Sequence, residues 1–295
     1  MKASRKLLAV LLVLVASILV AGCSSAQEAV RGKQITLGNI GWDENTVVAN
    51  MTKQLLENDL GYDKVEIQQA DVGPTFQGVG SGDIDAFQDV WMPNHQDYMS
   101  KVQDRVERLS NWYTDTTQFG LAAPAYMNIS SIDQINSTGV DEITGIEPGA
   151  VISEYIDNYT IPQYGLNVTQ RTSSTAAMLS ELDRKYKNSE PIIFPAWKPH
   201  WMNDDYDIVY LDDPKDTLYP LNRPSEVSSI VRQGLQNDNP DAYTLMDTIR
   251  LSEKDVVSIE RDPDFGSNPE EAVRKWIDNN RDTVQPWIDA AKAKQ

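Results

Sequence analysis

Three of the seven tryptophans in this chain occupy the same kind of place in the sequence. Trp42, Trp91 and Trp197 each end a short β-rich run and begin a polar or proline-bearing segment. In α/β sheets, ligands bind in the crevice at the carboxyl ends of the strands. We therefore predict that the three indoles converge on one binding site.

The other four tryptophans do not share this placement. Trp276 and Trp287 recur with helical spacing beside aliphatic residues, which predicts packing in a core. Trp112 and Trp201 receive no role. Because a single Trp commonly serves packing, it is the three strand-end tryptophans taken together that predict a site.

Three converging indoles favour one class of ligand group. A trimethylammonium group has no N–H to donate, whereas indole faces offer a negative quadrupole and a surface that excludes water. Each such contact contributes about 0.5–2 kcal/mol, so three contribute roughly 2–6 kcal/mol. Micromolar affinity requires about 8 kcal/mol after the costs of association. A second group of residues must therefore hold the other end of the ligand.

The segment from Gly145 to Ile152 is a candidate for that second group. It reads as a strand end, a Pro-Gly turn and the opening of a helix, which presents free backbone N–H groups to an anion. A carboxylate could bind the amides of Val151 and Ile152, and His95 could donate a further hydrogen bond. The alternatives are an ordinary strand-turn-helix junction and a surface or structural histidine.

The elements that would position these residues alternate between β-rich and amphipathic runs, which predicts an α/β fold. A helix follows Trp42, with Val48, Met51, Leu55 and Leu56 on one face and Gly61 as its stop. From Ser225 onward we expect helices. Strands are expected at residues 35–40, 65–72, 84–90, 119–124, 142–146, 191–196 and 208–211.

This pattern divides the chain into two lobes. The first is discontinuous and comprises residues 34–122 plus 215–295, and the second comprises residues 123–214. A mature chain of this length is sufficient for two lobes with separate cores.

The N-terminus predicts export and a lipid anchor. Basic residues precede an almost unbroken apolar stretch from Leu7 to Val20, which is typical of a secretion signal and short for a spanning helix. The Val-Ala-Gly-Cys sequence ending at Cys23 resembles the lipobox of prokaryotic lipoproteins. We expect a signal peptide at residues 1–22, lipid attachment at Cys23 and a tether at residues 23–33, which would place the protein on the outer face of the cytoplasmic membrane. The alternative is that Cys23 is incidental.

Composition argues against several other classes of function. Cys23 is the only cysteine, so the folded part has no disulfide, thiolate catalyst or cysteine metal site. A formal charge of −18 disfavours nucleic acid and anionic substrates. The two histidines form no metal motif, and neither a nucleophile elbow nor a phosphate loop is present, so we expect no enzyme activity, no cofactor and no metal.

Several segments together resemble the glycine-betaine-binding lipoproteins of bacterial and archaeal ABC osmoprotectant importers. They span nearly the whole mature chain and are most specific at Trp197. The segments are Gly41-Trp42-Asp43-Glu44, Gly80 to Trp91 with Pro93-Asn94-His95, Gly145-Ile146-Glu147-Pro148-Gly149, Ala196 to Met202 and Tyr210 to Lys215.

This resemblance implies a two-lobed periplasmic-binding-protein fold, type II-like, with the ligand in the interlobe cleft. It implies that Trp42, Trp91 and Trp197 surround the ammonium group, that the amides of Val151 and Ile152 with a histidine hold the carboxylate, and that the partners are a permease and an ATPase. One departure concerns the histidine, which the family can place five residues after its tryptophan. Here His95 is four residues after Trp91, and Gln96 stands at five.

The ligand itself stays open at this point. Glycine betaine and proline betaine fit the resemblance, while choline or carnitine would also use an aromatic cage. Choline has no carboxylate, so an intact pair of amides at Val151 and Ile152 favours a betaine. A surface scaffold lipoprotein and an extracellular hydrolase are the alternatives of a different class.

Overall fold

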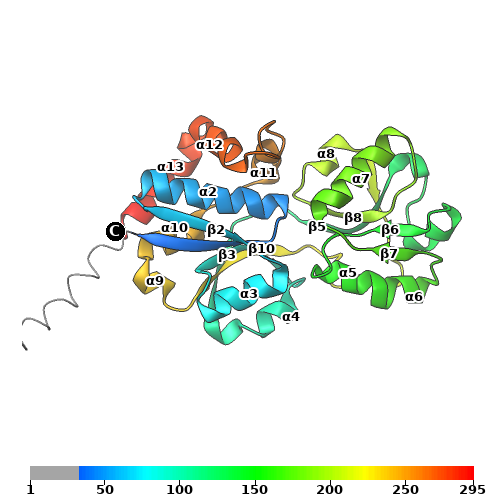
Figure 1. Cartoon of the computed structure of the whole chain (residues 1–295), viewed down its shortest axis with the longest axis horizontal. Helices are drawn as coiled ribbons and strands as arrows, with labels where there is room; N and C mark the ends of the chain where they lie inside the picture. Colours follow the sequence, from blue (N-terminus) through cyan, green and yellow to red (C-terminus); the bar gives the residue numbers. More distant parts are fainter. Residues whose placement is uncertain (1–32) are drawn as a thin grey trace, which may run out of the picture.

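The computed structural model describes residues 33–295 (Figure 1). The predicted signal peptide, Cys23 and all but the last residue of the predicted tether lie outside this range. Within it, no helix is both long and apolar enough to cross a membrane.

The first half of the molecule is built on a five-stranded sheet with the order β2-β1-β3-β10-β4. Strands β1, β2 and β3 run parallel, and β10 pairs antiparallel with both β3 and β4. Figure 1 shows helices on both faces of this sheet. The strands are β1 (Gln34–Asn39), β2 (Lys64–Gln69), β3 (Ala86–Met92), β4 (Val106–Asn111) and β10 (Glu226–Arg232).

The helices of this half pack around the sheet, with α12 against α2 and α13 against α10. They are α2 (Asp43–Asp59), α3 (Val72–Ser81), α4 (Gln96–Ser100), the 3-10 turn η2 (Gln103–Arg105), α9 (Leu235–Asp238), α10 (Pro240–Thr248), α11 (Glu253–Glu260), α12 (Pro269–Asn279) and α13 (Arg281–Lys292).

The second half has two smaller sheets, β8-β5-β9 and the parallel pair β6-β7. Its strands are β5 (Gln118–Pro124), β6 (Glu142–Thr144), β7 (Thr169–Arg171), β8 (Phe194–Lys198) and β9 (Ile208–Tyr210). Its helical segments are η3 (Ala125–Met127), η4 (Ile132–Ser137), α5 (Val151–Tyr155), the π-helical η5 (Ile156–Thr160), α6 (Ile161–Tyr164), α7 (Thr175–Lys187) and α8 (Met202–Asp205).

Helix α2 follows from simple sequence rules. Asp43 and Glu44 stand in its first turn, where acidic residues complement the helix dipole. The predicted face is confirmed, because all four of its apolar residues are buried. The helix ends at Asp59, and Gly61 leaves it with φ of +75°, a conformation that glycine adopts at little cost. This helix start places Trp42 at the edge of the sheet.

The expectation that the chain is helical from Ser225 onward is wrong for its first residues. Residues 226–232 form β10, which lies inside the larger sheet between β3 and β4. Ser228 and Ser229 interrupt the apolar run and hide the strand pattern, yet both are buried because the strand has neighbours on each side. Strands β4 and β7 were also not predicted.

The chain passes between the two halves twice, at residues 112–117 and at residues 211–225. Strand β5 therefore belongs to the second half, although the predicted division assigned residues 118–122 to the first lobe. The division into residues 34–122 plus 215–295 and residues 123–214 stays a prediction. Because β5 pairs with β8 and β9, the chain first crosses between the halves before residue 118, a few residues earlier than predicted.

Close packing of β1 against α3 depends on a glycine. A methyl group added at Gly38 would lie 2.6 Å from the methyl carbon of Thr75, a fully buried side chain. We expect Gly38→Ala to lower the free energy of unfolding by about 1–3 kcal/mol, the usual cost of overpacking. Urea unfolding measures this change. Gly266→Ala is the matched control, because no atom lies within 4 Å of the added carbon there, and equal losses in both variants would contradict the packing account.

Candidate ligand-binding site

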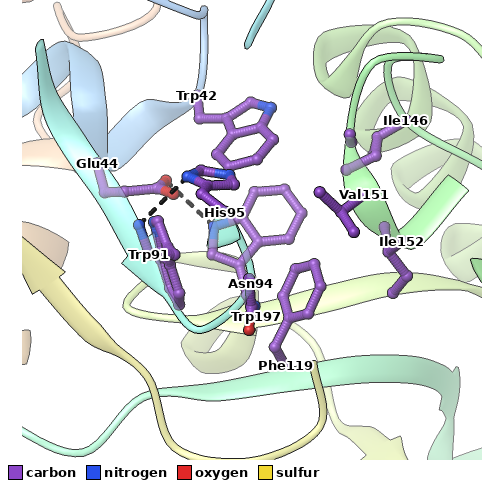
Figure 2. Close-up of a pocket in the computed structure, with 11 residues that line it drawn as sticks. Trp42, Glu44, Trp91, Asn94, His95, Phe119, Ile146, Val151, Ile152 and Trp197 are labelled. Carbon is purple, nitrogen blue, oxygen red and sulfur yellow. Dashed lines mark hydrogen bonds between the residues drawn. The ribbon is translucent and has the colours of Figure 1, made fainter. Parts of the chain in front are cut away.

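A pocket lies between the two halves (Figure 2). The structure brings all three strand-end tryptophans into its wall, together with His95 and both predicted amide residues. The residues that line it are Trp42, Glu44, Trp91, Asn94, His95, Phe119, Ile146, Ala150, Val151, Ile152 and Trp197. Each tryptophan is at most 6% exposed.

The aromatic rings form a continuous wall. The ring centroids of Trp42 and Trp197 are 6.0 Å apart, and Phe119 lies 6.2 Å from Trp91 and 6.3 Å from Trp197. The interplanar angles of 39°, 45° and 50° tilt the rings toward a shared space. Figure 2 shows Val151 and Ile152 on the opposite side of that space. The pocket thus has an aromatic side and a side formed by the start of α5.

Two structural details refine where the tryptophans sit. Trp42 follows β1 and caps the N-terminus of α2, as predicted. Trp91 and Trp197 lie within their strands, each one residue before the last residue of the strand. The strand geometry therefore fixes the direction of both indoles directly.

Each cage indole donates its N–H to a carboxyl group. Trp91 Nε1 donates to Asp89 Oδ1 at 2.8 Å and Trp197 Nε1 to Glu44 Oε2 at 3.1 Å. Trp42 Nε1 donates to Glu147 Oε2 at 3.1 Å. These bonds satisfy the indole N–H groups at the back of the rings, so that the ring faces are left to line the pocket.

Two of these carboxyls, Asp89 and Glu44, are deeply buried. Burial raises the pKa of Asp89 to about 8 despite the hydrogen bond from Trp91. Burial, and then the negative charge of Asp89, raise the pKa of Glu44 well above its usual value. Burial likewise raises the pKa of Glu260. A cation placed in the cage would favour the charged form of Glu44, which is the member of this group that lines the pocket.

The N-terminus of α5 presents backbone N–H groups that can bind a ligand. The first N–H groups of a helix have no partner inside the helix. Ala150, at the N-cap position, has no side chain that could accept them. Throughout residues 33–295, no acceptor is hydrogen-bonded to the amides of Val151 and Ile152, whereas the flanking amides of Ala150 and Ser153 are both bonded to backbone oxygens. These two N–H groups are therefore available to a ligand.

His95 is 2% exposed and held in a defined orientation. Its Nδ1 accepts a hydrogen bond from the backbone N–H of Trp91 at 3.3 Å, which leaves the proton on Nε2. Burial lowers the pKa of His95 to about 3, so the ring is a neutral donor across the physiological range. The shift in spacing from five residues to four does not remove this histidine from the pocket, while Gln96 is exposed and does not line it.

Sequence reasoning missed Phe119 and Glu44 as lining residues. Phe119 pairs with Trp197 across the β5–β8 ladder, so it enters the cage through a pairing between residues far apart in the chain. Glu44 follows Trp42 by two residues. An acidic residue is common in the first turn of any helix, so its position did not indicate a lining role. Asn94 was quoted with the Trp91 segment and lines the pocket through its position beside His95.

Trp276 and Trp287 are buried in the core, as predicted. Trp201 has a contact that the sequence did not reveal, because its Nε1 donates to Asp43 at 2.8 Å and its backbone N–H to Glu260 at 2.8 Å. Trp112 is fully buried and donates to the carbonyl of Gln88. None of these four lines the pocket.

The fold and the pocket together define a two-lobed substrate-binding protein. Residues 33–279 match the family described as the substrate-binding domain of ABC-type glycine betaine transport systems, and the chain belongs to this family.

Curated relatives agree with this family. The chain is 39% identical over 163 residues to the glycine betaine/carnitine transport binding protein GbuC of Listeria monocytogenes, an alignment that covers 54% of this chain and 52% of that protein. It thus spans about half the length of that relative. It is 22% identical to the glycine betaine-binding periplasmic protein OusX of Dickeya dadantii, with 85% and 87% of the two chains covered.

Solved structures share the fold. A lactococcal OpuAC, in its closed conformation with glycine betaine, superposes with a TM-score of 0.79 at 31% identity, covering 87% of this chain and 99% of the other. The glycine betaine/L-proline-binding protein ProX from Borrelia burgdorferi superposes with a TM-score of 0.79 at 27% identity, covering 89% and 100%.

The buried carboxyl of Asp89 predicts a pH-dependent stability. Its pKa is about 8 in the folded chain and about 4 in an unfolded one. Its protonated form therefore contributes stability that is complete below pH 4 and is lost as the pH rises through 8. Asp89→Asn keeps an acceptor for Trp91 but cannot ionise, so we expect its Tm to exceed that of the wild type by a few degrees at pH 8.5 and to match it at pH 4.5.

Differential scanning calorimetry at the two pH values checks this expectation. Asp104→Asn is the control, because Asp104 is exposed in η2. A Tm difference for Asp89→Asn that is the same at both pH values would contradict a proton held by the buried carboxyl.

Proposed function

We propose that this chain captures glycine betaine outside the cytoplasmic membrane and delivers it to the permease and ATPase subunits of an ABC importer. The observation that carries the proposal is that an aromatic cage and two free backbone amides face each other across one pocket. Glycine betaine has a trimethylammonium group at one end and a carboxylate at the other. Proline betaine shares both groups and fits the same arrangement.

Each group of the ligand has a matching set of residues. Trp42, Trp91 and Trp197 surround the ammonium group through cation–π contacts, and Phe119 completes the wall. The amides of Val151 and Ile152 bind the carboxylate at the positive end of the helix that begins there. His95 adds a neutral donor through Nε2.

The mode of action is binding and release. In this proposal the ligand holds two lobes closed, and their predicted division into residues 34–122 plus 215–295 and residues 123–214 is shifted so that β5 belongs to the second lobe. The largely apolar lining suits retention of an unreacted solute, and one relative of this chain is named a glycine betaine/carnitine transport binding protein.

Attachment to the membrane rests on the N-terminal sequence. We propose that cleavage after residue 22 leaves Cys23 carrying a lipid, so that the binding protein stays on the outer face of the cytoplasmic membrane. The small residues before Cys23 and the apolar stretch from Leu7 to Val20 support this assignment. Named relatives in this family include periplasmic proteins, which work on the same side of the membrane.

Choline is the second candidate ligand, and one observation favours it. Glu44 lines the cage beside Trp197, and a carboxyl in the wall complements a ligand whose only charge is positive. Choline would leave the amides of Val151 and Ile152 without a carboxylate partner. Side-by-side calorimetric titrations with glycine betaine, proline betaine, carnitine and choline rank these ligands.

The cage predicts a selective effect of losing one wall. We expect Trp197→Ala to weaken glycine betaine binding at least tenfold, about 1.4 kcal/mol. One cation–π contact is lost, and water enters the space that the ring filled. Isothermal titration calorimetry measures the affinity, and circular dichroism shows that the fold is kept. Trp276→Ala, in the core away from the pocket, is the matched control. If Trp276→Ala lost affinity and Trp197→Ala kept it, the site would be misplaced. If the wild type did not bind glycine betaine at millimolar concentration, the proposed function would be wrong.

The amides can be tested one at a time. Val151 is the first residue of α5, a position that accepts proline, and Ala150 before it has φ of −71° and ψ of 131°, which a following proline tolerates. Val151→Pro therefore removes one N–H and keeps the helix start. We expect glycine betaine to bind about tenfold more weakly, with choline affected far less.

Val151→Ala is the control for this substitution, because it shortens the side chain and keeps the amide. Calorimetry with both ligands separates the two effects. Equal losses of glycine betaine and choline binding in Val151→Pro would mean that the amide does not hold a carboxylate.

A further inference from the structure

Two of the three indole–carboxyl hydrogen bonds cross between the halves of the molecule. Trp42, which caps α2 in the first half, donates to Glu147 in the second. Trp197, from β8 in the second half, donates to Glu44 of α2 in the first. The bonds run in opposite directions, so each half supplies one ring and one acceptor. The Trp91–Asp89 bond, by contrast, lies within one strand.

Glu147 is itself firmly held. Its Oε1 accepts the backbone N–H of Thr175 at 2.7 Å, and its Oε2 accepts the hydroxyl of Thr175 at 2.9 Å. Thr175 is the first residue of α7, where the helix dipole favours a negative charge. Trp42 is therefore bonded to an acceptor that the second half has already fixed in place.

Glu147 also stands in the turn that leads to the free amides. The backbone N–H of Ala150 donates to the carbonyl of Glu147 at 3.0 Å, and the hydroxyl of Ser153 donates to the same carbonyl at 3.0 Å. One residue thus orders the start of α5 through its backbone and contacts Trp42 through its side chain. Glu147 does not line the pocket, so any effect on the ligand passes through these neighbours.

Separation of the halves would break both crossing bonds. Trp42 is 6% exposed and Trp197 is 2% exposed, and the two rings pack against each other across the boundary between the halves. In an opened cleft both rings and both carboxyls would be hydrated. The same two tryptophans would then act as walls for a ligand and as contacts that hold the halves together.

We propose that the reciprocal pairs Trp42–Glu147 and Trp197–Glu44 form an interlobe latch that sets the cage walls in place as the lobes close, and that Glu147 is a positioning residue for ligand capture. This inference deepens the proposed function and rests on it for the identity of the ligand. A ligand that contacts both rings stabilises the closed form, and the latch slows the reopening that releases it.

The test replaces the acceptor and keeps its shape. Glu147→Gln retains one oxygen for three donors, so at least one N–H faces an amide nitrogen instead of an acceptor. We expect glycine betaine to dissociate about tenfold faster from this variant, with a small change in the association rate, as measured by stopped-flow tryptophan fluorescence. Glu154→Gln is the matched control, because Glu154 is exposed on α5, the helix that follows Glu147.

Two further measurements separate positioning from simple support of the fold. In ¹⁵N-labelled protein, we expect the indole N–H of Trp42 to exchange slowly with solvent in the presence of glycine betaine, and rapidly in Glu147→Gln with the same ligand. Trp42→Phe keeps an aromatic ring without an N–H, so adding Glu147→Gln to it should cost little further affinity. A lowered Tm with unchanged dissociation and exchange rates would overturn the latch.

Failure of the proposed function has a different signature. If the wild type bound neither glycine betaine nor choline, the ligand assignment would fall, while the latch would still predict that Trp42→Phe and Glu147→Gln are non-additive in thermal unfolding. Additive effects of the two substitutions on unfolding would overturn the latch whatever the ligand is.

Discussion

The packing of aromatic rings from two halves of the chain around one space is the interaction on which this structure depends. Trp42 and Trp197 belong to different halves of the chain, yet their centroids are 6.0 Å apart. A pocket built in this way exists only while the halves meet. The sheets, the helix starts and the two crossing segments serve to bring these rings together with the first amides of α5.

Polar groups behind the rings make this apolar pocket possible. An indole carries one N–H, and burying it without a partner is costly. Here each cage indole donates to a carboxyl, and two of those carboxyls, Asp89 and Glu44, have raised pKa values because they are buried. The cage therefore rests in part on Asp89, whose pKa of about 8 keeps it protonated at neutral pH, and on Glu44, whose pKa is raised by burial and would be lowered by a cation in the cage. The affinity of the rings for a cation and the protonation of the acids behind them are thus linked.

The sequence predicted the elements that local patterns determine and missed those that depend on distant neighbours. Helix α2 was found from its apolar face and Gly61, and the three tryptophans from the ends of their strands. Strand β10 was missed because Ser228 and Ser229 are buried by strands on either side, which no local pattern reveals. Phe119 was missed for a related reason, since it joins the cage by pairing with Trp197. The hydrogen bond from Trp42 to Glu147 likewise joins residues 105 positions apart.

The position of β10 also limits the order in which the sheets can form. It lies between β3 and β4, so the larger sheet cannot be completed until residue 232 is available. All strands of the second half lie between residues 118 and 210 and can pair earlier. A chain made from its N-terminus therefore keeps β3 without its β10 neighbour for most of its synthesis. A late interior strand of this kind leaves the edge of β3 unpaired until residue 232 has been made.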